Sequence, residues 1–292
     1  MFKGLFRICG IIAGSMILLI VGFIFIKGVS VFLPSYGEGR LSFIDFMTGM
    51  TWQAESGQYG VLFIIINTLI SSFFAILISF PISVLTALFI VKIAPRWLSS
   101  ILQTVIELLA AIPSIVYGVF ASGVIVMAVD WLAVTMGFGT FGGRSLLSVV
   151  ILLAIMTLPT MTSLSITAIA SVSKDLENAS LALGASPTQT NFKVVLASAK
   201  SGIFAGLILG LSRALGEATA VSMVAGNRAL GPTFNPFDIT RTLTSTMLSG
   251  LSETTGADYD VRFSVGIVLI VLIFISNMII HAVKRKVGHH ES

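Results

Sequence analysis

Six long apolar stretches divide this sequence of 292 residues, and shorter polar segments separate them. Each stretch is long enough for an α-helix that crosses a bilayer, which needs about 20 residues. The pattern predicts spans over 8–33, 61–91, 101–129, 146–169, 202–225 and 262–283. Because no polar stretch is long enough to fold separately, we expect an all-α, polytopic membrane protein with a single domain over 1–292.

The fifth predicted span carries two ionisable residues near its middle, Arg213 and Glu217. A charge at that depth costs about 2.5–3.5 kcal/mol on insertion scales, so it usually faces a polar cavity or another helix. The spacing of four residues places both side chains on one helix face, roughly 6 Å apart along the axis. Two interpretations remain open: an ion pair that makes burial tolerable, or a direct role in the path of a solute.

Small residues recur every four positions along the same span, at Gly202, Gly206 and Gly210. This spacing lets two helix backbones approach closely inside a membrane. Ala214 and Ala218 continue the same face beside the two charged residues. We therefore expect the fifth span to be a central packing helix that borders a translocation path.

The longest polar loop, 170–200, has the pattern of two short amphipathic helices. A Gly-Ala-Ser-Pro sequence over 184–187 ends the first helix, and Ser186 with Gln189 forms a capping box that starts the second. Such a hairpin is suited to docking on a partner, while packing against the protein's own spans remains the alternative. For Glu107, in the third span, we expect a structural role through pairing with Lys92 or Arg96.

Composition agrees with a membrane protein, since charged residues make up 10% of the chain and mean hydropathy is +1.01. The net charge of +4 could indicate a nucleic-acid partner, but its distribution indicates membrane topology instead. With the N-terminus inside, the cytoplasmic segments carry Lys3, Arg7, Lys92, Arg96, Lys174, Lys193, Lys200, Lys284, Arg285 and Lys286. We therefore expect both termini in the cytoplasm and no nucleic-acid partner.

Several kinds of chemistry lack the residues that they need. Cys9 is the only cysteine, so neither an internal disulfide nor a cysteine-rich metal site is possible. The three histidines, His281, His289 and His290, lie at the C-terminal edge, which argues against a histidine-based triad. No phosphate-binding loop of the G-x-x-x-x-G-K-[ST] type occurs. We therefore expect no catalytic residue, no metal and no cofactor in this chain.

Three stretches carry a resemblance to a known family: 177–184, 192–196 and 211–227, supported by 107–118 and 241–245. They resemble ABC importer permeases and, more narrowly, the PstC-type subunits of phosphate importers. The chain departs from the family's cytoplasmic motif at two places. The motif's glutamate falls on Asn178, with Glu177 one residue early, and its Leu-Pro ending falls on Leu196-Ala197.

The resemblance implies a type I importer permease in a bacterial or archaeal cytoplasmic membrane, forming half of a pathway for inorganic phosphate. It implies three partners: a PstA-type sister permease, an ATPase dimer that binds ATP and Mg, and an extracytoplasmic phosphate-binding protein. The ATPase would be coupled through Glu177, Asn178, Ala179, Gly184 and Ala185. Arg213 would attract the oxyanion, and Glu217 would accept a hydrogen bond from protonated phosphate.

Three other interpretations are compatible with parts of the sequence. The cargo could be another oxyanion, such as molybdate or sulfate. A membrane enzyme would use Ser212 or Glu217 as catalytic groups, although no supporting base accompanies them. A gradient-driven secondary transporter would show inverted repeats with broken helices, and the sequence pattern contains no such signature.

Overall fold

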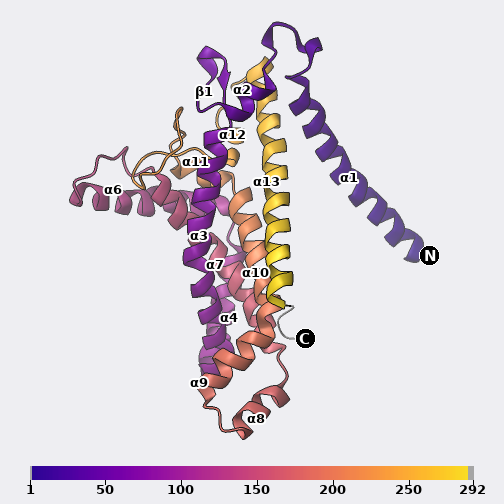
Figure 1. The fold of residues 1–292 in the computed structure, drawn as a ribbon, viewed down its shortest axis with the longest axis vertical. Coiled ribbons are helices and arrows are strands. Elements are labelled where there is room, and N and C mark those ends of the chain that lie inside the picture. The colour runs from indigo at the N-terminus through magenta and orange to yellow at the C-terminus, as the bar shows by residue number, and fades with distance from the viewer. Residues whose placement is uncertain (1, 289–292) are drawn as a thin grey trace.

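The computed structural model describes residues 2–288 as a mostly helical molecule, drawn in Figure 1. The first half contains α1 (Phe2–Ser30), the 3-10 helix η1 (Pro34–Gly39), α2 (Phe43–Thr48), β1 (Trp52–Gln53), the 3-10 helix η2 (Ala54–Ser56), β2 (Gln58–Tyr59), α3 (Leu62–Leu88), the π-helix η3 (Phe89–Ile93), α4 (Arg96–Ala111), α5 (Ser114–Phe120), the π-helix η4 (Ala121–Ile125) and α6 (Val126–Thr135). The second half contains α7 (Leu146–Ala170), α8 (Lys174–Ala182), α9 (Pro187–Gln189), the π-helix η5 (Thr190–Val195), α10 (Leu196–Gly216), α11 (Thr219–Val224), α12 (Leu243–Leu248) and α13 (Gly256–Gly288).

Six helical segments among the described residues are long and apolar enough to cross a membrane. They are Gly4–Ser30, Leu62–Ile93, Ser114–Thr135, Leu146–Ala170, Pro187–Gly216 and Gly256–Ala282. The prediction of an all-α protein with about six spans is therefore confirmed. The first, second, fourth and sixth predicted spans overlap these segments closely, whereas the third and fifth differ from them.

The third predicted span, 101–129, was wrong because the chain breaks inside it. Helix α4 ends at Ala111, and α5 begins after Pro113, which precedes it in an extended conformation (φ −59°, ψ 142°). Proline disfavours a helical conformation in the residue before it, and Ile112 is accordingly extended (φ −64°, ψ 127°). Figure 1 shows the result: α4 follows the long axis of the bundle, while α6 lies across it and projects to one side.

The fifth predicted span differs at both ends. Its helix begins at Pro187 and runs through α9, η5 and α10 without interruption, so the predicted second hairpin helix is the start of this long helix. It ends at Gly216, and Glu217 is extended (φ −73°, ψ 116°) before α11 begins at Thr219. The prediction of a continuous helix over 202–225 is therefore wrong.

Helix α7 is the most buried of the candidate spans. Of its apolar 18-residue stretch, 61% is buried inside the protein, against 28% of the corresponding stretch of Pro187–Gly216. Helix α7 contacts α3 and α10, while α10 contacts α3, α7 and α13. Small residues bring α10 close to α7: a Cβ added at Gly202 would lie 2.5 Å from the Cβ of Ala168, and one at Gly210 would lie 2.6 Å from Met161. Gly206 also faces α7, with Leu164 at 3.4 Å.

Buried hydroxyl groups join α7 to α3. The Thr157 hydroxyl donates to the Ser79 oxygen at 3.0 Å, and Ser83 donates to the Leu158 carbonyl at 3.2 Å. These bonds satisfy polar groups that would be costly to leave unpaired in an apolar medium. The α3–α7 contact is therefore closed and internally hydrogen-bonded.

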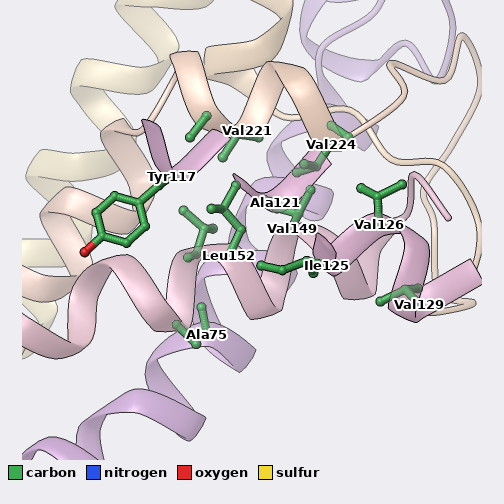
Figure 2. Packing of buried hydrophobic residues seen from close by; sticks show 14 of the residues in the cluster. Ala75, Tyr117, Ala121, Ile125, Val126, Val129, Val149, Leu152, Val221 and Val224 are labelled. Carbon is green, nitrogen blue, oxygen red and sulfur yellow. The ribbon is translucent and has the colours of Figure 1, made fainter. Parts of the chain in front are cut away.

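The largest apolar cluster fixes α11 against the rest of the molecule. Figure 2 shows Val221 and Val224 of α11 facing Val149 and Leu152 of α7, with side chains of the α5–η4–α6 segment between them. Gly118 of α5 lies directly under α11, where an added Cβ would meet the Met223 sulfur at 2.5 Å and the Ala220 Cα at 2.9 Å. The short helix α11 is thereby held in place by packing.

Helix α1 lies apart from the bundle in Figure 1, and no residue of its apolar 18-residue stretch is buried inside the protein. It is joined to α13 near its C-terminal end, where Lys27 pairs with Asp260 at 3.3 Å and Ser264 donates to the Gly28 carbonyl at 2.6 Å. Tyr36 also donates to Asp260, at 2.9 Å. Burial, together with this carboxylate, raises the pKa of Tyr36 to about 12.

The end of the molecule that carries α2 also carries the antiparallel hairpin of β1 and β2, in which Trp52 is opposite Tyr59. Burial and the carboxylate of Asp258 raise the pKa of Tyr59 to about 12. Arg262 donates to the carbonyls of Thr246 and Ser249, which are left without donors at the C-terminal end of α12. These contacts tie α12 to α13.

Candidate functional site

The interruption between α10 and α11 brings together the charged residues that the sequence singled out. Glu217 lies in the interruption itself, and its Oε1 accepts a hydrogen bond from the Ala220 amide at 3.1 Å. The carboxylate therefore caps the first turn of α11, which explains why a helix restarts two residues later. Glycine at position 216 weakens the end of α10, since it is a poor helix former.

Arg213 does not pair with Glu217. Within residues 2–288 no ion pair joins the two side chains, and the buried Nε of Arg213 has no hydrogen-bond partner. The predicted geometry, a pair on one face of a continuous helix, is therefore wrong because the helix ends between the two residues. An unpartnered guanidinium nitrogen in the membrane-spanning part is a costly arrangement, and such residues usually have a functional role.

Helix α12 approaches the interruption from the other side. The Thr244 hydroxyl donates to the main-chain carbonyl of Glu217 at 2.7 Å. Thr242 caps α12 in a reciprocal capping box with Ser245. Thr242, Thr244, Ser245 and Thr246 are all buried, so a group of hydroxyls lies beside the broken helix. These hydroxyls already donate to main-chain carbonyls and to one another, whereas a guanidinium is a group that hydrogen-bonds an oxyanion.

The segment between α11 and α12 folds back against α3. The Asn67 side-chain oxygen accepts from the Thr233 amide at 2.8 Å, and the Thr68 hydroxyl oxygen accepts from the Leu243 amide at 3.0 Å. Arg241 braces the segment from within by donating to two carbonyls. Burial lowers the pKa of Arg241 to about 10. The position of α12 at the interruption is thus set by the outer part of α3.

Ser212, which the sequence offers as a catalytic group, donates to the side-chain oxygen of Asn277 at 3.1 Å. An amide oxygen is no general base, so this arrangement gives no support to a nucleophilic serine. Within the described residues there is no group of three His, Cys, Asp or Glu that could hold a metal ion. His289 and His290 lie outside the described residues.

The hairpin at the opposite end of the molecule has the local geometry that its sequence predicts. Ser186 and Gln189 form the capping box, with bonds of 3.2 Å and 3.0 Å. Gly184 ends the first helix with a positive φ of 86°, a conformation that glycine adopts without strain. Asn178, Ala179 and Gly184 are exposed, whereas Ala185 is half-buried.

Glu177 behaves differently from its neighbours in the hairpin, because it forms an ion pair with Lys92 at the end of η3. Both side chains are largely buried. The expected pairing of Glu107 with Lys92 is therefore wrong, and Glu107 is exposed on α4. Sequence reasoning missed the Lys92–Glu177 pair because 85 residues separate its members and no local pattern connects them.

Comparison with protein families places these features in context. A model of the family described as "Binding-protein-dependent transport system inner membrane component" matches residues 79–289, which is more than half of the chain. The "Probable ABC transporter permease protein YqgH" of Bacillus subtilis (strain 168) is 37% identical over 285 residues, covering 96% of this chain and 89% of that protein. The "Phosphate transport system permease protein PstC" of Pasteurella multocida (strain Pm70) is 31% identical over 262 residues, covering 84% and 82%.

Solved structures share the fold at low sequence identity. A bacterial ABC transporter involved in the import of the acidic polysaccharide alginate superposes with a TM-score of 0.63 at 17% identity, over 94% of this chain and 95% of that one. An inward-facing MetNI methionine ABC transporter gives a TM-score of 0.54 at 21% identity, over 78% and 94%. These likenesses concern the arrangement of helices alone.

Proposed function

Because the chain belongs to the family of binding-protein-dependent transport system inner membrane components, we propose that it is the PstC-type permease of an ATP-driven importer of inorganic phosphate. As an ABC importer permease it is a multi-pass membrane protein. Relatives named as phosphate transport permeases, about 30% identical over most of the chain, support the choice of phosphate. The structural neighbours carry other cargoes by name, so the choice of substrate rests on the relatives and on the site.

One observation carries the proposal: the half-buried Arg213 lies beside a helix interruption, and its Nε is buried without a hydrogen-bond partner. Attraction between charges is stronger in a low-dielectric interior than in water, so this cation favours entry of an anion into the membrane. The hydroxyls of α12 next to it already donate within the protein, so the guanidinium is the group that would bind the anion. A passing oxyanion would accept the hydrogen bond for which the Nε of Arg213 has no partner.

Glu217 would provide selectivity. An ionised carboxylate only accepts hydrogen bonds, and phosphate at neutral pH still carries a proton that it can donate. Fully ionised sulfate has no such proton and would be repelled by the carboxylate. The Ala220 amide occupies Oε1 of Glu217. The second oxygen would be the one that accepts from the substrate.

The remaining parts of the proposal concern partners and orientation. The hairpin around α8 would dock on an ATPase dimer, which would bind ATP and Mg and hydrolyse the nucleotide, while this chain would catalyse no reaction. A PstA-type sister permease would complete the pathway, and an extracytoplasmic phosphate-binding protein would deliver the anion to the α2 end. Both termini would then be cytoplasmic, as the distribution of basic residues indicates.

The test is transport by the intact complex. Co-purified permeases, ATPase and binding protein would be reconstituted in liposomes and supplied with ATP and labelled phosphate, molybdate or sulfate. We expect uptake of phosphate that excess sulfate does not inhibit. Preferential uptake of sulfate or molybdate would replace phosphate by that oxyanion, and ATP-independent uptake by this chain alone would contradict the whole assignment.

A further inference from the structure

Helix α8 is weakly attached to the rest of the protein. It has no buried residue, and its leucines Leu176 and Leu181 are about half exposed. Within the hairpin, Ser180 and Thr190 share a hydrogen bond of 2.9 Å. Beyond the hairpin, Glu177 forms the ion pair with Lys92. That pair connects α8 to the helix that η3 continues, which is α3.

Helical periodicity explains why Glu177 points inward. Successive residues of an α-helix are rotated by about 100°, so Glu177 and Asn178 face different directions. The Glu177 side chain keeps 20% of its exposure and lies against Lys92, whose side chain keeps 14%, while Asn178 and Ala179 are exposed. The carboxylate is thus held by the permease itself, and the surface open to a partner is formed by other residues.

Helix α3 extends from this ion pair to the candidate site. From Lys92 to Thr68 the chain rises by roughly 36 Å at 1.5 Å per residue. At that far end, the Thr68 hydroxyl oxygen accepts from the Leu243 amide at the start of α12. The next residue, Thr244, donates to the Glu217 carbonyl in the helix interruption. A continuous series of bonded contacts therefore joins the hairpin to the interruption.

We propose that Lys92 and Glu177 are positioning residues that tie the hairpin to α3, so that displacement of α8 moves α3 and, through α12, the interruption at Glu217. This proposal rests on the proposed function, in which α8 docks on the ATPase. A largely buried ion pair is suited to the role, since water and salt screen it less than an exposed pair. Without the pair, α8 is linked to α3 only indirectly, through α7 and through the Ser180–Thr190 hydrogen bond.

The experiment compares the assembled complexes of wild type, Lys92→Gln, Glu177→Gln and the exchanged pair Lys92→Glu with Glu177→Lys. The readout is the number of anions taken up per ATP hydrolysed in proteoliposomes. We expect both single variants to hydrolyse ATP but to lower this ratio by roughly fivefold or more, and the exchange to restore at least half of it. Glu107→Gln is the matched control: it makes the same change at an exposed carboxylate of α4, outside the hairpin, and its ratio should stay near that of wild type.

Single variants with the wild-type ratio, or an exchanged pair that stays uncoupled, would overturn the proposal. If Lys92→Gln reduces assembly, Lys92→Met keeps the packing of the stem and removes only the charge. If Lys92→Met also reduces assembly, the exchanged pair provides the test. Recovery of both assembly and the number of anions per ATP supports the proposed link between α8 and α3, and failure of both overturns it. Failure of this proposal can be distinguished from failure of the phosphate assignment, because the number of anions per ATP is measured with whichever oxyanion the wild-type complex transports.

Discussion

Two membrane helices are interrupted in this protein, one at Pro113 and one at Glu217, and they differ in what the interruption leaves unpaired. At Pro113 the Tyr117 hydroxyl donates to the Leu109 carbonyl at 2.8 Å, so a carbonyl freed at the end of α4 is satisfied from within the chain. At Glu217 the main chain is satisfied by Thr244, but Arg213 keeps a buried donor without a partner.

The difference separates a structural bend from a candidate binding site. Proline alone accounts for the first interruption. Glycine and a capping carboxylate account for the second, and a charge remains beside it. Broken membrane helices are tolerated where protein or a water-filled cavity covers them, so a break alone does not identify a binding site. The unpartnered Nε of Arg213 distinguishes the interruption at Glu217 from the one at Pro113.

The largest expected effect concerns Arg213. Arg213→Gln removes the cation, and since a hydrogen bond to a charged group is worth about 1.5–3 kcal/mol, uptake per assembled complex should fall by roughly 100-fold at the upper end. The double variant Arg213→Gln with Glu217→Gln should remain inactive, because the attraction for the anion stays absent. The measurement is labelled phosphate uptake, with assembly checked by co-purification.

Arg96→Gln, at an exposed position on α4, is the charge-matched control for that experiment. Near-normal uptake by the double variant would reduce Arg213 and Glu217 to structural residues, because a buried charged group can often be replaced at little net cost when its counterpart is removed too. The two interruptions would then be equivalent in function.

A smaller effect is expected from Gly216→Ala. An added Cβ meets nothing within 4 Å, so the substitution introduces no clash. Alanine favours a helix over glycine by about 1 kcal/mol, which should shift α10 toward continuing through Glu217 and lower uptake by roughly fivefold. Unchanged uptake, with unchanged thermal stability, would mean that packing and not residue 216 sets the end of α10.

Tyr117→Phe tests the other interruption. It removes the hydroxyl donor from the Leu109 carbonyl, which keeps only the 3.4 Å hydrogen bond from the Ile112 amide, and should cost about 1 kcal/mol of stability. Uptake per assembled complex should stay near that of wild type, because the hydroxyl is already engaged at the bend. Thermal unfolding in detergent and uptake are measured together; a loss of uptake larger than the loss of stability would show that the bend also takes part in transport.

The smallest effect is a pH dependence at the α2 end, away from both interruptions. Tyr36 and Tyr59 have pKa values raised to about 12 in the folded protein, above the ordinary value of 10.0. Between pH 10 and 12 the unfolded chain releases these protons and the folded chain retains them, so their stabilising contribution is complete below pH 10 and is lost as pH rises through 12. Phenolate absorbance and unfolding followed over that range would check this sign. A double variant Tyr36→Phe with Tyr59→Phe should flatten the dependence, and a slope that persists in it would contradict the assignment.

Sequence patterns predicted what depends on neighbours along the chain. Apolar length gave six spans, and Ser186 with Gln189 gave a capping box, since both are local properties. The interruption at Glu217 was missed because Arg213 to Ala218 is compatible with a continuous helix, and the contact that completes the break comes from Thr244, 27 residues later. The pair between Lys92 and Glu177 was missed for the same reason, as only the folded chain brings them together.

The helix from Pro187 to Gly216 has 30 residues, which corresponds to roughly 45 Å at 1.5 Å per residue. A bilayer's hydrocarbon core is about 30 Å thick, so at least some 15 Å of this helix stands outside it. The hairpin is thus carried on a rigid stalk away from the lipid surface. A change in acyl-chain length that tilts this helix would therefore also change the distance between the membrane surface and the partner that meets α8.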